Sequence, residues 1–143
     1  MIDSKMISQL LEKLSEQTLQ SNLHWLSLPR YFETNKNEPL RRYVINNNKY
    51  AYSGGKFTGK LPLISEYRSQ CVSIGGGIVI LFNYKESPNA EYYALAVQVD
   101  STCEISVLDC SEEQREQIHN LHKLVTDTQY DVSRFIKDII ERF

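Results

Sequence analysis

Several short motifs in this 143-residue chain combine residue types that could do chemistry. The strongest match is the segment 54–60, in which the two leading glycines and the final Gly59-Lys60 fit the pattern G-x-x-x-x-G-K of phosphate-binding loops. Such a loop continues with Ser or Thr, which binds magnesium, and opens a helix whose amides face the phosphates. Here Leu61 and Pro62 follow, and a proline biases the residue before it away from helical geometry. We therefore expect a loop at this segment and no nucleotide site.

The glycine run 75–77 also falls short of a nucleotide-binding motif. The last glycine of G-x-G-x-x-G would fall on Ile80, which lies inside an apolar run typical of a strand. A tight turn between two strands is the simpler interpretation.

Histidines and a cysteine near the C-terminal half could form a metal or catalytic site. His119 and His122 are three residues apart in a segment with helical periodicity, so both could point toward a zinc ion. No further ligand is suitably spaced, and we expect surface histidines, with no metal and no cofactor. Cys110 directly precedes a predicted helix, where partial positive charge can lower the pKa of a thiol. A cysteine nucleophile also needs a base, so an enzyme built on Cys110 is only our third hypothesis, behind two binding functions.

The charged residues are distributed unevenly along the chain. The segment 30–68 carries eight basic and three acidic residues, whereas the whole chain has a formal net charge of −2. Within this segment, a predicted hairpin at 41–60 interleaves cations with aromatic rings. Its candidate binding residues are Arg41, Arg42, Tyr43, Lys49, Tyr50, Tyr52, Lys56 and Lys60. Such a surface suits a protein partner, because Tyr and Arg are enriched at hot spots, or single-stranded nucleic acid, because cations bind phosphates while rings stack on bases. A solvated hairpin whose tyrosines cover the core edge, or a small-molecule site, are the other interpretations.

Hydrophobic periodicity predicts the elements that must position these residues. The first twenty residues predict an amphipathic helix capped by Asp3 or Ser4. From 41 to 109, apolar segments separated by short turns predict five or six antiparallel strands, with the run 78–82 at the centre. Ser111 and Gln114 form a capping box before a helix that should end near residue 126, and a last helix with an apolar stripe covers 132–143.

These elements predict one α+β domain over residues 1–143. We expect an N-terminal helix, a meander-like antiparallel sheet, and two C-terminal helices packed on one face of that sheet. The expected core contains Trp25, Ile80, Leu95, Val97, Ile136 and Ile140.

Composition and cysteine content predict the cellular compartment. The chain is 41% hydrophobic and 24% charged, which is ordinary for a globular domain. Three cysteines without a C-x-x-C pair favour a reducing compartment. No apolar run reaches the roughly 20 residues that span a bilayer, and no apolar signal segment follows the start. We therefore expect a cytoplasmic protein with no membrane partner.

The N-terminal segment carries one resemblance to known proteins. Leu10-Leu11-Glu12-Lys13-Leu14, then Thr18 and Leu23-His24-Trp25, resembles the start of small uncharacterised bacterial and mobile-element proteins, in which an amphipathic helix and a polar turn lead into a Leu-x-Trp strand. The match covers about sixteen residues, and the turn Gln20-Ser21-Asn22 lacks the Gly or Lys expected there. The resemblance implies a small bacterial accessory protein of unassigned function and carries no site residues.

The absence of a coherent catalytic set, together with the basic and aromatic hairpin, favours a non-enzymatic protein-binding or regulatory module. Its expected partner is an unknown protein, and a homodimer through the last helix or a sheet edge is a second option. The alternative is a single-stranded nucleic-acid-binding module.

The nucleic-acid alternative makes a prediction that fluorescence anisotropy can check. Labelled single-stranded oligonucleotides should bind with micromolar affinity, and binding should weaken steeply with salt because phosphate contacts release counterions. An absence of binding at about 50 mM salt, where these contacts are least screened, would remove this alternative.

Overall fold

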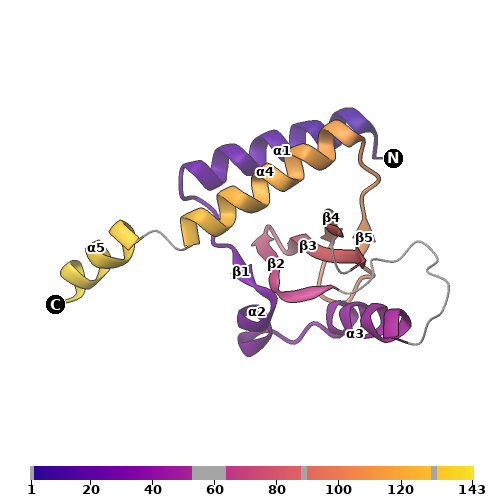
Figure 1. Cartoon of the computed structure of the whole chain (residues 1–143). Coiled ribbons are helices and arrows are strands. Elements are labelled where there is room, and N and C mark those ends of the chain that lie inside the picture. Colours follow the sequence, from indigo (N-terminus) through magenta and orange to yellow (C-terminus); the bar gives the residue numbers. More distant parts are fainter. Residues whose placement is uncertain (1, 53–63, 88–89, 130–131) are drawn as a thin grey trace.

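The computed structural model shows an antiparallel sheet between two layers of helices (Figure 1). It describes residues 2–52, 64–87, 90–129 and 132–143. The five strands lie in sequence order across the sheet: β1 (Leu26–Ser27), β2 (Ser65–Ile74), β3 (Gly77–Ser87), β4 (Ala90–Gln98) and β5 (Ser106–Val107). The predicted α+β class and antiparallel sheet are confirmed.

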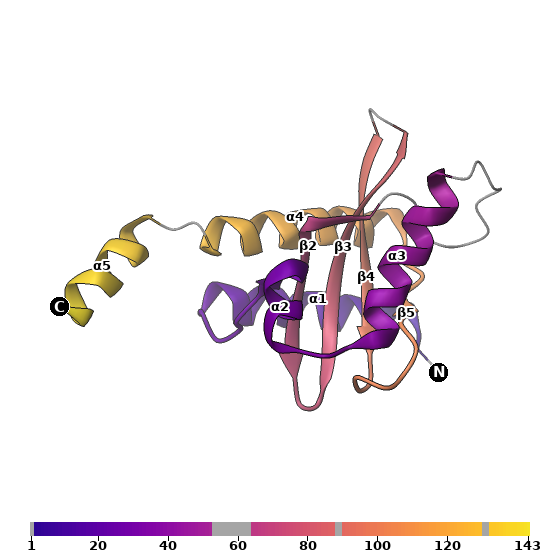
Figure 2. The ribbon, with the colours of Figure 1, turned by 90° about the horizontal axis from the view of Figure 1, so that it is seen from below.

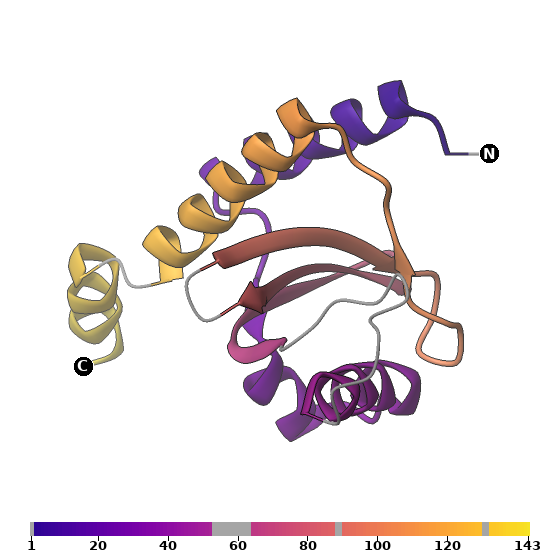
Figure 3. The same cartoon turned by 45° about the vertical axis from the view of Figure 1, so that its right-hand side comes forward.

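The central strand β3 is apolar on both faces, as predicted. Ile80 and Phe82 are fully buried on one face, where they contact helices α2 (Leu28–Thr34) and α3 (Glu38–Tyr52). Leu81 is fully buried on the opposite face, against helices α1 (Ser4–Leu19) and α4 (Glu112–Gln129). The sheet is therefore covered on both sides, as Figure 3 shows.

Helices α1 and α4 lie side by side over the sheet and run in the same direction (Figures 1 and 3). The carboxylate of Asp3 caps α1 by accepting the amide of Met6 at 2.8 Å. The capping box of α4 is confirmed, since Ser111 N donates to Gln114 Oε1 at 2.9 Å and Gln114 N donates to Ser111 Oγ at 3.2 Å. Helix α4 continues through Gln129, past the expected end near residue 126.

The side chain of Gln114 also joins the starts of the two helices. Its Nε2 donates to Ser4 O at 2.8 Å and to Ser8 Oγ at 2.9 Å. These bonds satisfy the polar groups of a glutamine that is only 3% exposed, so they fix the relative position of α1 and α4.

The predicted hairpin at 41–60 is wrong, because residues 38–52 form helix α3 on the other face of the sheet (Figure 2). Leu40 and Val44, four residues apart, are buried against the sheet. The Tyr43 ring stacks on Phe82 with centroids 5.3 Å apart. Asn37 Oδ1 accepts the amide of Leu40 at 3.2 Å and so satisfies one donor of the first turn. The G-x-x-x-x-G-K segment lies outside the described residues.

The glycine run forms the predicted turn between β2 and β3. Gly75 and Gly76 have φ of 59° and 96°, and Ile74 pairs with Gly77. This is a two-residue hairpin whose positive φ values favour glycine. At Gly77, an added Cβ would lie 2.8 Å from the carbonyl oxygens of Gln98 and Val99, so the close approach to β4 also requires glycine.

Helix α5 (Val132–Arg142) forms as predicted but does not pack on the sheet. It extends beyond the end of α4, away from both layers (Figures 1 and 2). Trp25, Ile80 and Leu95 of the expected core are buried, and Val97 is partly buried against it. Ile136 and Ile140 are 51% and 70% exposed, so their placement in the core was wrong. No described helix is long and apolar enough to cross a bilayer.

This packing predicts that truncation of a side chain in β3 lowers stability strongly, whereas truncation in α5 hardly changes it. Leu81→Ala should lower the free energy of unfolding by about 2–5 kcal/mol, since it empties a fully buried site. Ile140→Ala should change it by about 0.5 kcal/mol or less, because the side chain is exposed. Urea denaturation of both variants measures the difference, and similar losses would contradict the position of α5.

Candidate functional site

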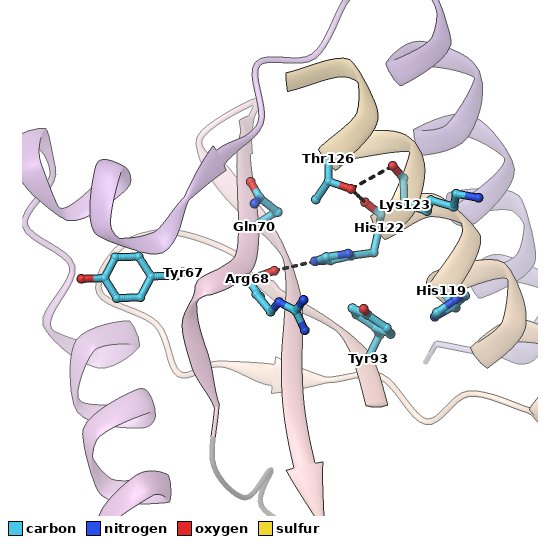
Figure 4. A pocket seen from close by; sticks show the side chains of 8 residues that line it. All are labelled: Tyr67, Arg68, Gln70, Tyr93, His119, His122, Lys123 and Thr126. Atoms are coloured by element: carbon cyan, nitrogen blue, oxygen red, sulfur yellow. Dashed lines mark hydrogen bonds between the residues drawn. The ribbon is translucent and has the colours of Figure 1, made fainter. Parts of the chain in front are cut away.

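A pocket of about 360 Å³ opens between β2, β4 and α4. Figure 4 shows the residues that line it: Tyr67, Arg68, Gln70, Tyr93, His119, His122, Lys123 and Thr126. His119, His122, Lys123 and Thr126 follow one another at helical spacing along α4, while the others come from the sheet. The pocket therefore forms only where α4 crosses the strands.

His122 joins α4 to the sheet at the centre of this pocket. Its ring is 6% exposed, and Nε2 donates to the backbone oxygen of Arg68 at 2.5 Å. The neutral ring then has its proton on Nε2 and a lone pair on Nδ1. Burial lowers the pKa of His122, and the charge of Arg68 lowers it further, although the bond to Arg68 O and the carboxylate of Glu91 oppose this shift. We conclude that His122 is a neutral imidazole at pH 7.

Three rings form one wall of the pocket. The Tyr93 centroid lies 4.3 Å from that of His122 and 5.0 Å from that of His119. Burial raises the pKa of the Tyr93 phenol, and the nearby Glu91 carboxylate raises it further. Tyr93 therefore keeps its proton at neutral pH. Tyr67 points to the other side of β2 and is not part of this wall (Figure 4).

A polar network lies beside the rings and holds Arg68 in place. Glu91 Oε1 accepts from Arg68 Nη1 and from Asn83 Nδ2, both at 2.5 Å. These contacts lower the pKa of Glu91, with the Asn83 bond as the larger cause, so the carboxylate stays ionised at neutral pH. Asn83 is fully buried, and its Oδ1 has no hydrogen-bond partner among the described residues.

The side chains that line the pocket are neutral or cationic. Tyr93 and His122 are neutral at pH 7, and the Thr126 hydroxyl is engaged with the backbone oxygens of His122 and Lys123 at 3.1 and 2.9 Å. Within the described parts of the chain, no three His, Cys, Asp or Glu side chains are placed to hold a metal ion. The pocket therefore offers cations, rings and neutral donors to a ligand.

Cys110 lies outside this pocket, in surroundings that disfavour its thiolate. The thiol is half-buried, and it donates to the Leu108 backbone oxygen at 3.5 Å. Burial raises its pKa, and Asp109 raises it further, which is opposite to the lowering that its position before a helix suggested. The thiolate is disfavoured at neutral pH, and no described histidine is hydrogen-bonded to it.

The predicted binding residues that the structure describes lie on helix α3 and not on a hairpin. Arg41 and Arg42 are exposed on α3, with the Arg41 guanidinium 4.6 Å from the centre of the Phe32 ring, whereas Tyr43 packs on the core. Lys49, Tyr50 and Tyr52 lie in the last part of α3, and Lys56 and Lys60 lie outside the described residues. Whether these residues bind a partner stays a prediction.

The exposed face of α5 is a second candidate surface. The large apolar residues of α5, and Phe143 directly after it, have these exposed fractions: Phe135 66%, Ile136 51%, Ile139 43%, Ile140 70% and Phe143 101%. Phe135 and Asp138 line a hollow of about 390 Å³ beside Trp25, but this hollow leaves most of Phe135 uncovered. The apolar periodicity of this helix was evident in the sequence, and only its assignment to the core was wrong.

Both histidines of the pocket were expected at the surface. His119 is exposed as expected, but His122 is only 6% exposed, so the expectation was wrong for it, because its ring packs between α4 and the sheet. Their shared helical face is visible in the sequence, and the same spacing adds Lys123 and Thr126. Arg68 and Tyr93 are far from α4 in the sequence, and no local pattern connects them to it.

No protein-family model matches the chain, and neither a curated protein nor a solved structure shows significant similarity to it.

The buried His122 predicts a specific pH dependence of stability. Because its pKa in the folded state lies below the ordinary 6.5, its contribution to folding is present above that pH and is lost as the pH falls through the folded-state pKa. Each unit of difference is worth about 1.4 kcal/mol. Urea denaturation between pH 7.5 and 5.5 should show a smaller loss for His122→Gln, which keeps a donor for Arg68 O, than for the wild type.

His119→Gln is the matched control, since it changes an exposed histidine on the same helix beside Tyr93. Arg68, Glu91, Tyr93 and His119 face His122 and stay unchanged in the test variant. Equal pH responses of the wild type and His122→Gln would contradict the assignment.

Proposed function

We propose that the chain is a non-enzymatic protein-binding module that acts through the apolar face of α5. One observation carries the proposal: four large apolar side chains on this short helix are 43% or more exposed, and Phe143 directly after it is fully exposed. Burial of apolar surface stabilises a complex by about 25 cal/mol per Å², so this face gains most when a partner covers it.

The isolation of α5 supports the same function. The helix has 11 residues, and isolated helices shorter than about 12–15 residues are marginal in water. Its apolar face makes little contact with the sheet or with α4, so the fold provides little to stabilise it. A partner that covers the face would stabilise both the helix and the complex.

The partner surface that fits α5 best is a hydrophobic groove on a different protein. Eleven residues span about 16 Å, which is fewer than two heptads, whereas coiled coils need about three to four heptads. A second α5 would cover only one narrow stripe of this helix. A groove contacts both sides of an inserted helix and takes anchors at intervals of three and four residues, as Ile136, Ile139 and Phe143 provide.

The charges of α5 favour a groove without a strongly charged rim. Arg134, Lys137 and Arg142 exceed Asp138 and Glu141 by one, so the helix presents only a weak positive field. We also propose a cytoplasmic location, which the free thiols of Cys71, Cys103 and Cys110 support because disulfides are rare in a reducing compartment.

The proposal predicts that polar substitutions in α5 abolish binding and spare stability. A photo-crosslinking residue at position 139 would identify the partner, which is then purified for titration against the full-length chain. The double variant Ile136→Asp, Ile140→Asp should weaken this binding more than about 30-fold, as expected for two anchors in a desolvated groove. Its melting temperature should stay within about 2 °C of the wild type, because both side chains are exposed.

Lys137→Asp is the control for added negative charge, because helical periodicity places Lys137 opposite the apolar face. It should leave the affinity within about threefold of the wild type. A purified partner that binds the double variant as tightly as the wild type would overturn the proposal. So would a chain that is a stable dimer alone and becomes monomeric in the double variant, since a second copy would then cover α5.

A further inference from the structure

The pocket between β2, β4 and α4 is lined by positively charged side chains and by no negatively charged one. Among the eight described residues that line it, two carry a full positive charge, Arg68 and Lys123, and none carries a carboxylate. The nearest acidic group, Glu91, is bonded to Arg68 and Asn83 beside the pocket. Arg68, Lys123 and Glu91 together leave one net positive charge at this site.

Both cations retain donors for a ligand. The contact with Glu91 uses Arg68 Nη1, and a guanidinium has five N–H donors, so others stay open. Lys123 is exposed at the rim, and its ammonium has no acidic partner within 4.0 Å in the described chain. Glu91 fixes the direction of the Arg68 side chain, which lowers the entropy cost of binding at that group.

The rings and the size of the pocket restrict the ligand further. Tyr93 packs against His119 and His122, and Figure 4 shows these rings and the Arg68 guanidinium around one space. A pocket of about 360 Å³ lies near the lower end of the range for small-molecule sites, roughly 300–1,000 Å³. It has room for one ring with a short substituent.

We propose that this pocket binds a small organic oxyanion that carries a planar ring, an aryl carboxylate or an aryl phosphate ester. The oxyanion accepts from Arg68 and from Lys123, whose side chain points away from Arg68 in Figure 4 and turns toward the pocket when the ligand binds. The ring packs against Tyr93 and His119. Neutral His122 forms the floor, where its bond to Arg68 O keeps β2 and α4 together. This inference is independent of α5, since no residue of that helix lines the pocket.

Amide NMR titration of the full-length chain tests the inference. The probes are phenyl phosphate, benzoate, inorganic phosphate and the uncharged benzyl alcohol, each up to about 10 mM, a range that detects millimolar dissociation constants. Phenyl phosphate or benzoate should shift amides of residues 68–70 and 119–126, and the stronger of the two identifies the class of oxyanion. Inorganic phosphate should bind more weakly because it lacks the ring.

Lys123→Gln should weaken binding of the stronger probe about three- to tenfold, because it removes one charge and leaves the rings unchanged. Lys5→Gln, at an exposed lysine of α1 that does not line the pocket, is the matched control and should not change affinity. Equal shifts with benzyl alcohol, equal affinities of Lys123→Gln and the wild type, or no shifts at these amides with either aryl anion would overturn the inference. An amide spectrum of each variant that matches the wild type without ligand shows that the fold is intact.

Discussion

The burial of β3 on both faces is the constraint on which the other elements depend. A strand with Ile80 and Phe82 on one side and Val79 and Leu81 on the other cannot leave either side in water without exposing a contiguous apolar surface. Two helical layers follow from this, α1 with α4 on one face and α2 with α3 on the other. The pocket is a consequence of the same constraint, because α4 must cross β2 and β4 to cover its face of the sheet.

The fold class and the central strand could be predicted from local patterns, but α3 could not. Tyr43, Val44 and Ile45 have high β-propensity, and the three asparagines that follow are typical of a turn. The contacts of Leu40 and Val44 with the sheet override that propensity, and these contacts exist only in the folded chain. The four-residue spacing of Leu40 and Val44 was the signal for a helix, and the polar neighbours hid it.

The apolar face of α5 and the pocket beside α4 could be predicted from the sequence to different degrees, because local patterns do not show long-range contacts. A periodic stripe shows that α5 has an apolar face, but periodicity contains no information about what covers that face. The pocket shows the converse, because His119 and His122 share a helical face in the sequence while their contacts with Tyr93 and Arg68 depend on long-range packing. One helix thus exposes more apolar surface than the fold needs, and another carries an aromatic and basic pocket.

The bonds from Gln114 to Ser4 and Ser8 can form only after α4 has been synthesised, long after α1 has left the ribosome. Gln114 and Ser4 are 110 residues apart, so at a synthesis rate of 5–20 residues per second α1 emerges about 5–20 s before α4 can join it. During this interval the leucines of α1 lack the helix that covers them in the finished domain. The nascent chain therefore presents a chaperone with the apolar face of α1 until α4 has been synthesised.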